Sequence, residues 1–344
     1  MAALLLPFFL ANMASAACYF DDGPSGRLSN YCAIQLINGQ RVDNRSLSLI
    51  DYRLKMEGNT NGLGLPAKVK KHTTQNFLSP LLFYSNNING GNSSKPLKLG
   101  NLTFEGEEKL FSKVGILAGV GAGLNNRYIY SDGRYLQYSA NISYAYSPKH
   151  KLGVGTVGAR ACDIRRILNS WYLDSCAGQS RTRKDLSDTT NSELSFVTSN
   201  SFKNFEQSFS QVDFGVKRFF TKSYTQNQVV LGFDTIHSND VFTDFGATFG
   251  EAITSKLATR LSLSGRIIVS IADKPLSLSA TYTDSDGGIM LGVSRSEKNY
   301  GISVSYPIWQ KVKLSVGYQK TNSTIDHYNF QSPTLGLELP VIQF

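Results

Sequence analysis

Beyond its N-terminus, the chain lacks a long apolar run. After its first residues, no stretch approaches the roughly 18 to 20 uninterrupted apolar residues that a membrane-spanning helix needs. Charged residues are sparse, at 18% of 344 residues, and the formal charge of +9 is spread along the chain rather than clustered. This distribution argues against a nucleic acid as partner, while an anionic membrane surface or cargo stays open.

Catalytic motifs are also missing. The chain has only four histidines, none in a paired metal-binding motif, and it has no G-x-S-x-G elbow. The glycine run GVGAGLNN at 119–126 lacks the Lys-Ser/Thr of a phosphate loop. We therefore expect a protein that is not an enzyme, with no cofactor and no metal. One weaker alternative is a membrane hydrolase, since His237 is followed by Ser238.

The N-terminus has the layout of a secretory signal. An apolar run from Ala2 to Ala11 is followed by small residues up to Ala17, although no Lys or Arg precedes the run. We assign residues 1–17 to a cleaved signal peptide, with a lipid anchor on Cys18 and a buried helix as weaker alternatives. Residues 18–45 form a short segment, a tether or a small plug.

The four cysteines form two pairs with identical spacing. Cys18 with Cys32 and Cys162 with Cys176 do not match a metal-knuckle pattern. An even number of cysteines in an exported protein favours disulfides formed in an oxidising compartment. We therefore predict two local disulfide bonds.

Apolar and polar residues alternate with a period of two through most of the chain. In residues 300–319, YGISVSYPIWQKVKLSVGYQ, two alternating stretches flank a short break, which predicts a hairpin. The pattern returns in 114–124, 136–146, 212–216, 241–249, 261–271, 276–282 and 289–293. SPKH at 147–150, ADKP at 272–275 and DSDG at 284–287 are expected turns.

The composition of the polar faces separates a soluble sandwich from a membrane barrel. These faces carry mostly Ser, Gly, Asn, Gln and Thr, which suit a confined lumen rather than bulk water. Aromatic residues recur near the turns, as lipid interfaces select. We predict that residues 46–344 form a closed antiparallel transmembrane β-barrel of 12 to 16 strands, with 14 as the central value, in a bacterial outer membrane with its lipid bilayer as partner.

Alternation also assigns residues to the lumen. If the leucines of 261–271 face lipid, then Arg260 and Arg266 point inward. The same phase places the following residues in the lumen: Gln211, Asp213, Lys217, Lys313 and Gln319. The side of the membrane that holds the Cys162–Cys176 loop stays open, because counting strands back from the C-terminus conflicts with the short SPKH turn.

The last strands carry a family resemblance. The chain ends on Phe344, a terminal aromatic typical of bacterial outer-membrane proteins, although Pro340 interrupts the final alternation, so either a bulge resets the phase or the strand ends before it. KLSVGYQKTNS, TIDHYNF and LGLEL resemble the closing strands of surface lipoprotein assembly modifiers and exopolysaccharide export porins. This resemblance implies a conduit for lipoproteins or sugar polymers.

We expect a channel or conduit for a solute, polymer or lipoprotein cargo, because 14 or more strands leave room inside a barrel. A structural or surface-display barrel is the alternative. The oligomeric state is left open.

Overall fold

The structure is a computed structural model that describes Cys18 and residues 26–39, 71–92, 96–99, 101–168, 170–204, 208–237, 241–272, 274–309 and 312–343. The expected signal peptide, the stretch 46–70 that we assigned to the barrel, and Phe344 lie outside these residues. Among the described residues, no helix is long and apolar enough to cross a membrane.

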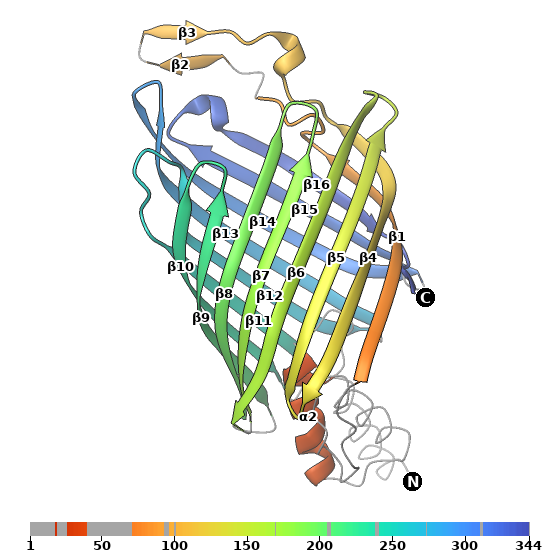
Figure 1. Ribbon diagram of the computed structural model, residues 1–344. Coiled ribbons are helices and arrows are strands. Elements are labelled where there is room, and N and C mark those ends of the chain that lie inside the picture. Colours follow the sequence, from red (N-terminus) through yellow and green to blue (C-terminus); the bar gives the residue numbers. More distant parts are fainter. Residues whose placement is uncertain are drawn as a thin grey trace, which may run out of the picture.

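One antiparallel sheet of fifteen strands closes on itself, because β16 pairs with β1 (Figure 1). Fourteen strands make the wall and the two-residue β17 (Ile342–Gln343) adds to β1. The wall strands are β1 (Lys71–Ser85), β4 (Gly115–Ser131), β5 (Arg134–Ser147), β6 (Leu152–Leu168), β7 (Trp171–Arg183), β8 (Asp188–Lys203), β9 (Phe209–Thr221), β10 (Thr225–Ile236), β11 (Val241–Gly250), β12 (Ala258–Ile271), β13 (Lys274–Met290), β14 (Val293–Trp309), β15 (Val312–Ser323) and β16 (Phe330–Glu338). The predicted closed barrel and its central strand number are confirmed.

The outer surface is apolar and the inner wall is polar. Ile116, Ile302 and Phe214 point outward and are 61%, 60% and 57% exposed. Their neighbours in the sequence, such as Gly301 and Ser303, face the other side of the sheet. Because successive side chains of a strand alternate between faces, each strand places one set of residues outside and the other in the lumen.

The two ends of the barrel differ in their connections (Figure 1). At the end where β1 begins and β16 finishes, here the terminal end, the strands are joined by short connections such as 132–133 and 272–273. The opposite end, here the loop end, carries the long connection 86–114 with β2 (Leu97–Leu99), β3 (Leu102–Phe104) and the 3-10 helix η2 (Glu108–Leu110). The β15–β16 connection there holds the 3-10 helix η4 (Asp326–Tyr328).

One expected turn and one expected strand need correction. DSDG at 284–287 lies within β13, where a bulge between Ser285 and Gly288 absorbs it, and the chain turns at Leu291–Gly292 instead. The stretch 289–293, expected as one strand, therefore contains this hairpin turn between the end of β13 and the start of β14. Asp and Gly accommodate a bulge as readily as a turn, so their presence does not distinguish the two. SPKH does form a turn, and it lies at the loop end, away from the chain termini.

The C-terminal strand is interrupted as Pro340 suggested. Glu338 pairs with Leu81, whereas Ile342 pairs with Leu78, so four steps along the last strand match three along β1. One extra residue therefore resets the phase, which is a β-bulge. Of the two possibilities left by the sequence, the bulge is correct.

The helix α2 (Gly26–Gly39) lies at the terminal end, against the inner wall (Figure 1). Leu28 of α2, Cys18 and Cys32 pack on four apolar residues of the wall: Phe209, Ile236, Phe242 and Ile268. Ser29 and Asn30 of the helix are also buried. The described part of the N-terminal segment therefore packs on the inner wall.

Candidate functional site in the barrel lumen

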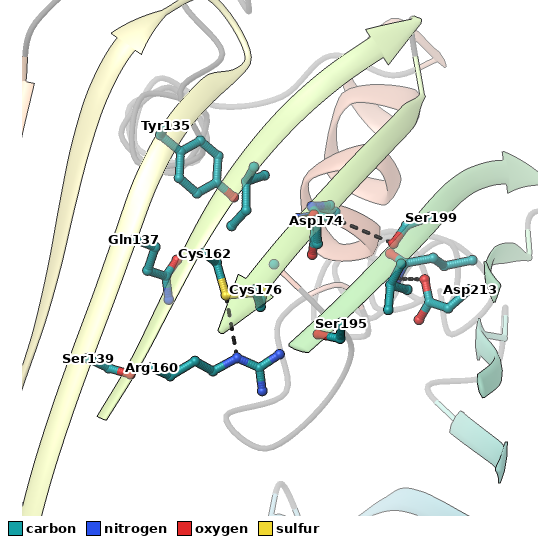
Figure 2. A pocket seen from close by; sticks show the side chains of 15 residues that line it. Tyr135, Gln137, Ser139, Arg160, Cys162, Asp174, Cys176, Ser195, Ser199 and Asp213 are labelled. Carbon is teal, nitrogen blue, oxygen red and sulfur yellow. Dashed lines mark hydrogen bonds and ion pairs between the residues drawn. A yellow bond between two sulfur atoms is a disulfide. The ribbon is translucent and has the colours of Figure 1, made fainter. Parts of the chain in front are cut away.

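A polar cavity of about 440 Å³ lies inside the barrel next to α2 (Figure 2). Strands β5 to β9 supply most of its lining, including Tyr135, Arg160 and Asp213, and Arg27 comes from the helix. A lining drawn from five consecutive strands and a helix packed on them places this cavity in the lumen. Its surface combines hydroxyl, amide and charged groups, so it suits a hydrophilic solute.

A second cavity of about 390 Å³ shares Ser139 and Arg160 with the first. Asn141, Ser180 and Glu193 also line it, together with backbone at glycines of β6 and β7. Because the two cavities meet at the same side chains, they form consecutive sections of one lumenal space along β5 to β9.

Two cations and one carboxylate meet on this wall. Arg160 Nη1 lies 3.2 Å from Glu193 Oε1, and Lys217 Nζ lies 3.5 Å from Glu193 Oε2. Arg160 remains half exposed, with 51% of its side chain accessible. The cluster therefore presents a net positive charge to the lumen, and Glu193 neutralises part of it.

An acidic group lies on the neighbouring strands. Asp234 and Asp244 are directly opposite each other on β10 and β11, and Asp213 is opposite Gly232, the next inward position along β10. Arg266 of β12 donates a hydrogen bond from Nη2 to Asp244 Oδ2 at 2.8 Å. Its guanidinium also lies 5.5 Å from the centre of the Phe242 ring. The arginine thus compensates an otherwise acidic part of the wall.

The structure spreads the predicted lumen residues over several parts of the wall. Gln211 donates to Asp213 Oδ1 at 2.8 Å, and both line the first cavity. Lys313 lies 3.9 Å from Glu338, next to the closure of the barrel. Gln319 is paired opposite Gly301 and Ser332.

Arg260 is the exception to regular alternation. The register of β12 against β13 shifts between Thr259 and Leu261, so Arg260 occupies a bulge and is exposed. A bulged residue is not constrained to the face that the alternation predicts, so the simple inward assignment does not carry over to it.

Both predicted disulfides are present. Cys18 is bonded to Cys32, which ties the start of the described chain to α2. Cys162 and Cys176 are directly opposite each other on β6 and β7, with Cα atoms 4.1 Å apart. The second disulfide is therefore a cross-strand link within a hairpin, and it lines the first cavity beside Arg160 (Figure 2). The β6–β7 turn lies at the terminal end.

Part of the long connection enters the lumen at the loop end. Ile88 is fully buried and packs with Leu117 and Ala145 of the inner wall. The carbonyl of Asn89 accepts a hydrogen bond from the amide of Leu186 at 2.7 Å, and Lys184 Nζ donates to the carbonyl of Asn87 at 2.8 Å. Residues 86–92 therefore cross from β1 to the β7–β8 connection and narrow the entrance. Burial at this contact lowers the pKa of Lys184 below its ordinary value.

The described residues also bear on metal binding and on hydrolysis. No group of three or more His, Cys, Asp or Glu side chains there is placed to hold a metal ion. A ring nitrogen of His237 lies 3.0 Å from Thr243 Oγ1, and Ser238 lies outside the described residues.

Sequence reasoning missed Arg160, Glu193, Asp174, Asp234 and Asp244. The stretches around the first three, such as ARACDIRRIL and NSELSFVTSN, place polar residues on both faces, so no clean alternation marks them. Asp234 and Asp244 lie on alternating strands, and continuing the inward phase along 225–250 would have found them.

The known proteins that this chain resembles are solved structures. No protein-family model matches the chain, and no curated protein matches it. Among solved structures, the chain is similar to Pseudomonas aeruginosa OccK2 (OpdF) in complex with glucuronate, with 8% identity over 80% of this chain and 98% of that one and a TM-score of 0.41. It is also similar to a BenF-like porin from Pseudomonas fluorescens Pf-5, with 8% identity over 81% and 100% of the two chains and a TM-score of 0.38. For Acinetobacter baumannii OccAB2 the identity is 6% over 80% and 98%, and the TM-score is 0.39. Similarity at this level carries no functional assignment.

Proposed function

We propose that the protein is an outer-membrane channel through which small hydrophilic solutes diffuse. The observation that carries this proposal is a closed barrel of fourteen strands with an apolar outer surface and a polar inner wall that encloses cavities. A barrel of eight strands is filled by its own side chains, whereas larger barrels leave room for water or for a plug.

The outer surface supports a location in lipid. Large apolar side chains that are 40% or more exposed recur around the barrel, among them Ile142 at 59%, Phe196 at 55% and Leu335 at 51%. A monomeric protein in water rarely exposes a contiguous apolar patch of more than a few hundred Å². A bilayer removes this conflict, and the closed sheet satisfies its backbone hydrogen bonds without water.

The lumen supports small, hydrophilic solutes of low net charge. Cations and carboxylates alternate along the wall, as in the Arg160–Glu193–Lys217 cluster and the Arg266–Asp244 pair. Neither sign dominates the described wall, so we expect weak selection between anions and cations. The two cavities, of about 440 and 390 Å³, are large enough for a small molecule that carries a few polar groups.

Three alternatives to a solute channel follow from the sequence and the structure. Because α2 and residues 86–92 occupy opposite ends of the lumen, a structural or display barrel without transport is the second candidate. A conduit for a lipoprotein or sugar polymer, which the resemblance of the closing strands implied, would need both obstructions to move. For the hydrolase alternative the candidate residue is His237, whose ring nitrogen lies 3.0 Å from Thr243 Oγ1.

The test has two steps. Fractionation should recover the protein in the outer membrane, in a form whose gel mobility changes on heating. The purified protein should then conduct ions in a planar bilayer. In a swelling assay, proteoliposomes that contain it should swell because small sugars enter through the channel. Recovery from the soluble periplasm would contradict the barrel's location, and a folded barrel that passes no current would favour the structural alternative.

A further inference from the structure

We propose that α2 is a built-in plug of the channel, and that its ion pair with Asp174 holds it in the lumen and limits permeation at the terminal end. This inference rests on the proposed function, since a plug has a measurable effect only in a barrel that conducts.

The polar contact of the helix is concentrated on Arg27. Its Nη2 donates to Asp174 Oδ1 of β7 at 2.6 Å, and its Nη1 donates to Ser199 Oγ of β8 at 3.2 Å. The guanidinium also lies 4.6 Å from the centre of the Tyr172 ring. Only 11% of the Arg27 side chain is exposed, so this pair is largely shielded from water. A charged residue buried this far is stable only while its partner is present.

The apolar contact lies one residue further along. Leu28 is fully buried and Cys32, one turn later, is 1% exposed, and both belong to the cluster with Phe209 and Phe242. Tyr31 meets the Phe209 ring edge to face, with the centroids 6.2 Å apart. These wall residues are apolar although they face the lumen, and polar residues occupy nearby inward positions of the same strands: Gln211, Asp213, Asp234 and Asp244. The helix α2 covers this apolar patch and removes it from the water of the lumen.

The position of the helix gives it a consequence for transport. Gly26 and Arg27 line the same cavity as Arg160 and Asp213. The helix α2 therefore lies beside the path that a solute would take from this cavity to the terminal end (Figure 1). The helix is bonded to the wall through side chains of β7 and β8 rather than as part of the sheet, so it can leave without any loss of strand pairing.

A charge reversal and its rescue test the proposal. Arg27→Asp would face Asp174 with a like charge and should release the helix, so single-channel conductance should rise several-fold over the native protein. The double variant Arg27→Asp with Asp174→Arg restores an ion pair and should return the conductance toward the native value. Gln35→Glu, which adds a negative charge at a half-buried position of the same helix, is the matched control and should leave the conductance unchanged.

The outcomes separate plug and channel. If the native protein conducts and Arg27→Asp conducts equally well, α2 does not limit permeation and the proposal is wrong. If Arg27→Asp raises the conductance and the double variant does not lower it, the role given to the ion pair is wrong. Heat-dependent gel mobility shows whether Arg27→Asp folds. If it does not, Leu28→Asp replaces it as the variant that releases the helix, because it disrupts the apolar contact. A native barrel that is silent, with both release variants silent as well, overturns the channel itself.

Discussion

Adjacent residues of one strand face different surroundings. On β12, Ile267 is 45% exposed on the outer surface, while Arg266 bonds Asp244 in the lumen. Ile267→Arg would place a charge in the apolar belt, and we expect it to lower the free energy of unfolding in lipid by about 2 to 4 kcal/mol. A denaturant titration followed by gel mobility measures this loss.

Ser264→Arg is the matched control for this change. Ser264 lies on the inner face of the same strand and is exposed to the lumen. Because the lumen is wet, an arginine there should leave the unfolding midpoint nearly unchanged. A larger loss for Ser264→Arg than for Ile267→Arg would mean that the strand faces are reversed.

Charge balance at single residues should set ion preference. Glu193→Gln leaves Arg160 and Lys217 without their shared carboxylate, so the reversal potential in a salt gradient should shift toward anions. Arg266→Gln removes the positive charge beside Asp244, so the reversal potential should shift toward cations. Shifts in the same direction for both variants would contradict the wall described here. Asn191→Gln, in the second cavity, is the neutral control.

At the scale of elements, the inserted segment 86–92 depends on one close approach. Gly90 has a φ of +74°, and a Cβ on it would lie 2.1 Å from Ser187 Oγ. Gly90→Ala should therefore release the segment from the β7–β8 connection, and trypsin should cut faster at Lys98 and Lys109 in the same connection.

The β13–β14 turn offers the control for this substitution. Gly292 has a φ of +83° with nothing within 4 Å of its Cβ position. Gly292→Ala has the same unfavourable backbone conformation, which costs about 1 to 2 kcal/mol, but meets no neighbour. Equal trypsin sensitivity in the two variants would show that the unfavourable backbone conformation of alanine, rather than its collision with Ser187, causes the faster cleavage.

The β11–β12 connection contains a pH-dependent contact. Glu251 accepts hydrogen bonds from the backbone amide of Asn227 at 2.8 Å and from its side-chain amide, and these bonds lower the pKa of Glu251 below its ordinary 4.5. A lowered pKa means that the contribution to stability is present above pH 4.5 and is lost as the pH falls through the folded value. The protection factor of the Asn227 amide, which corrects for the pH dependence of intrinsic exchange, should therefore fall at low pH, and Glu251→Gln should abolish this fall.

At the scale of the whole molecule, the closure of the barrel is its weakest seam. Within the described residues, β1 meets β16 and β17 in five residue pairs, whereas β1 and β4 share fifteen. Pro80 and Pro340 lie along this seam, and proline has no amide hydrogen to donate to the ladder.

Hydrogen exchange tests this unevenness. Backbone amides of β16 and of β1 on the side that faces β16 should exchange faster than those of the β4–β5 and β5–β6 ladders. Uniform protection around the barrel would contradict a preferred opening between the first and last strands.

The alternation of single residues predicted most of the wall and much of its facing. Where alternation is strict, as in 300–319, the strands lie where the sequence predicts them. With a period of two, a shift of one residue would exchange the apolar and polar faces, so the pattern specifies which face is outside. Where polar residues fall on both faces, as around Arg160 and Glu193, the pattern carried no signal. DSDG was mistaken for a turn, since a bulge and a turn select the same residues.

The sequence by itself determined that the chain forms strands with one apolar and one polar face, that the strands are numerous enough to close, and which cysteines are paired. These properties are local, because they depend on residues two apart or on short spacings. Only the tertiary structure decided which charges meet across strands, where the phase resets at Pro340, and that Arg27 reaches Asp174 from a helix in the lumen. Those contacts join residues distant in sequence, and their partners are fixed by register and barrel closure rather than by any local pattern.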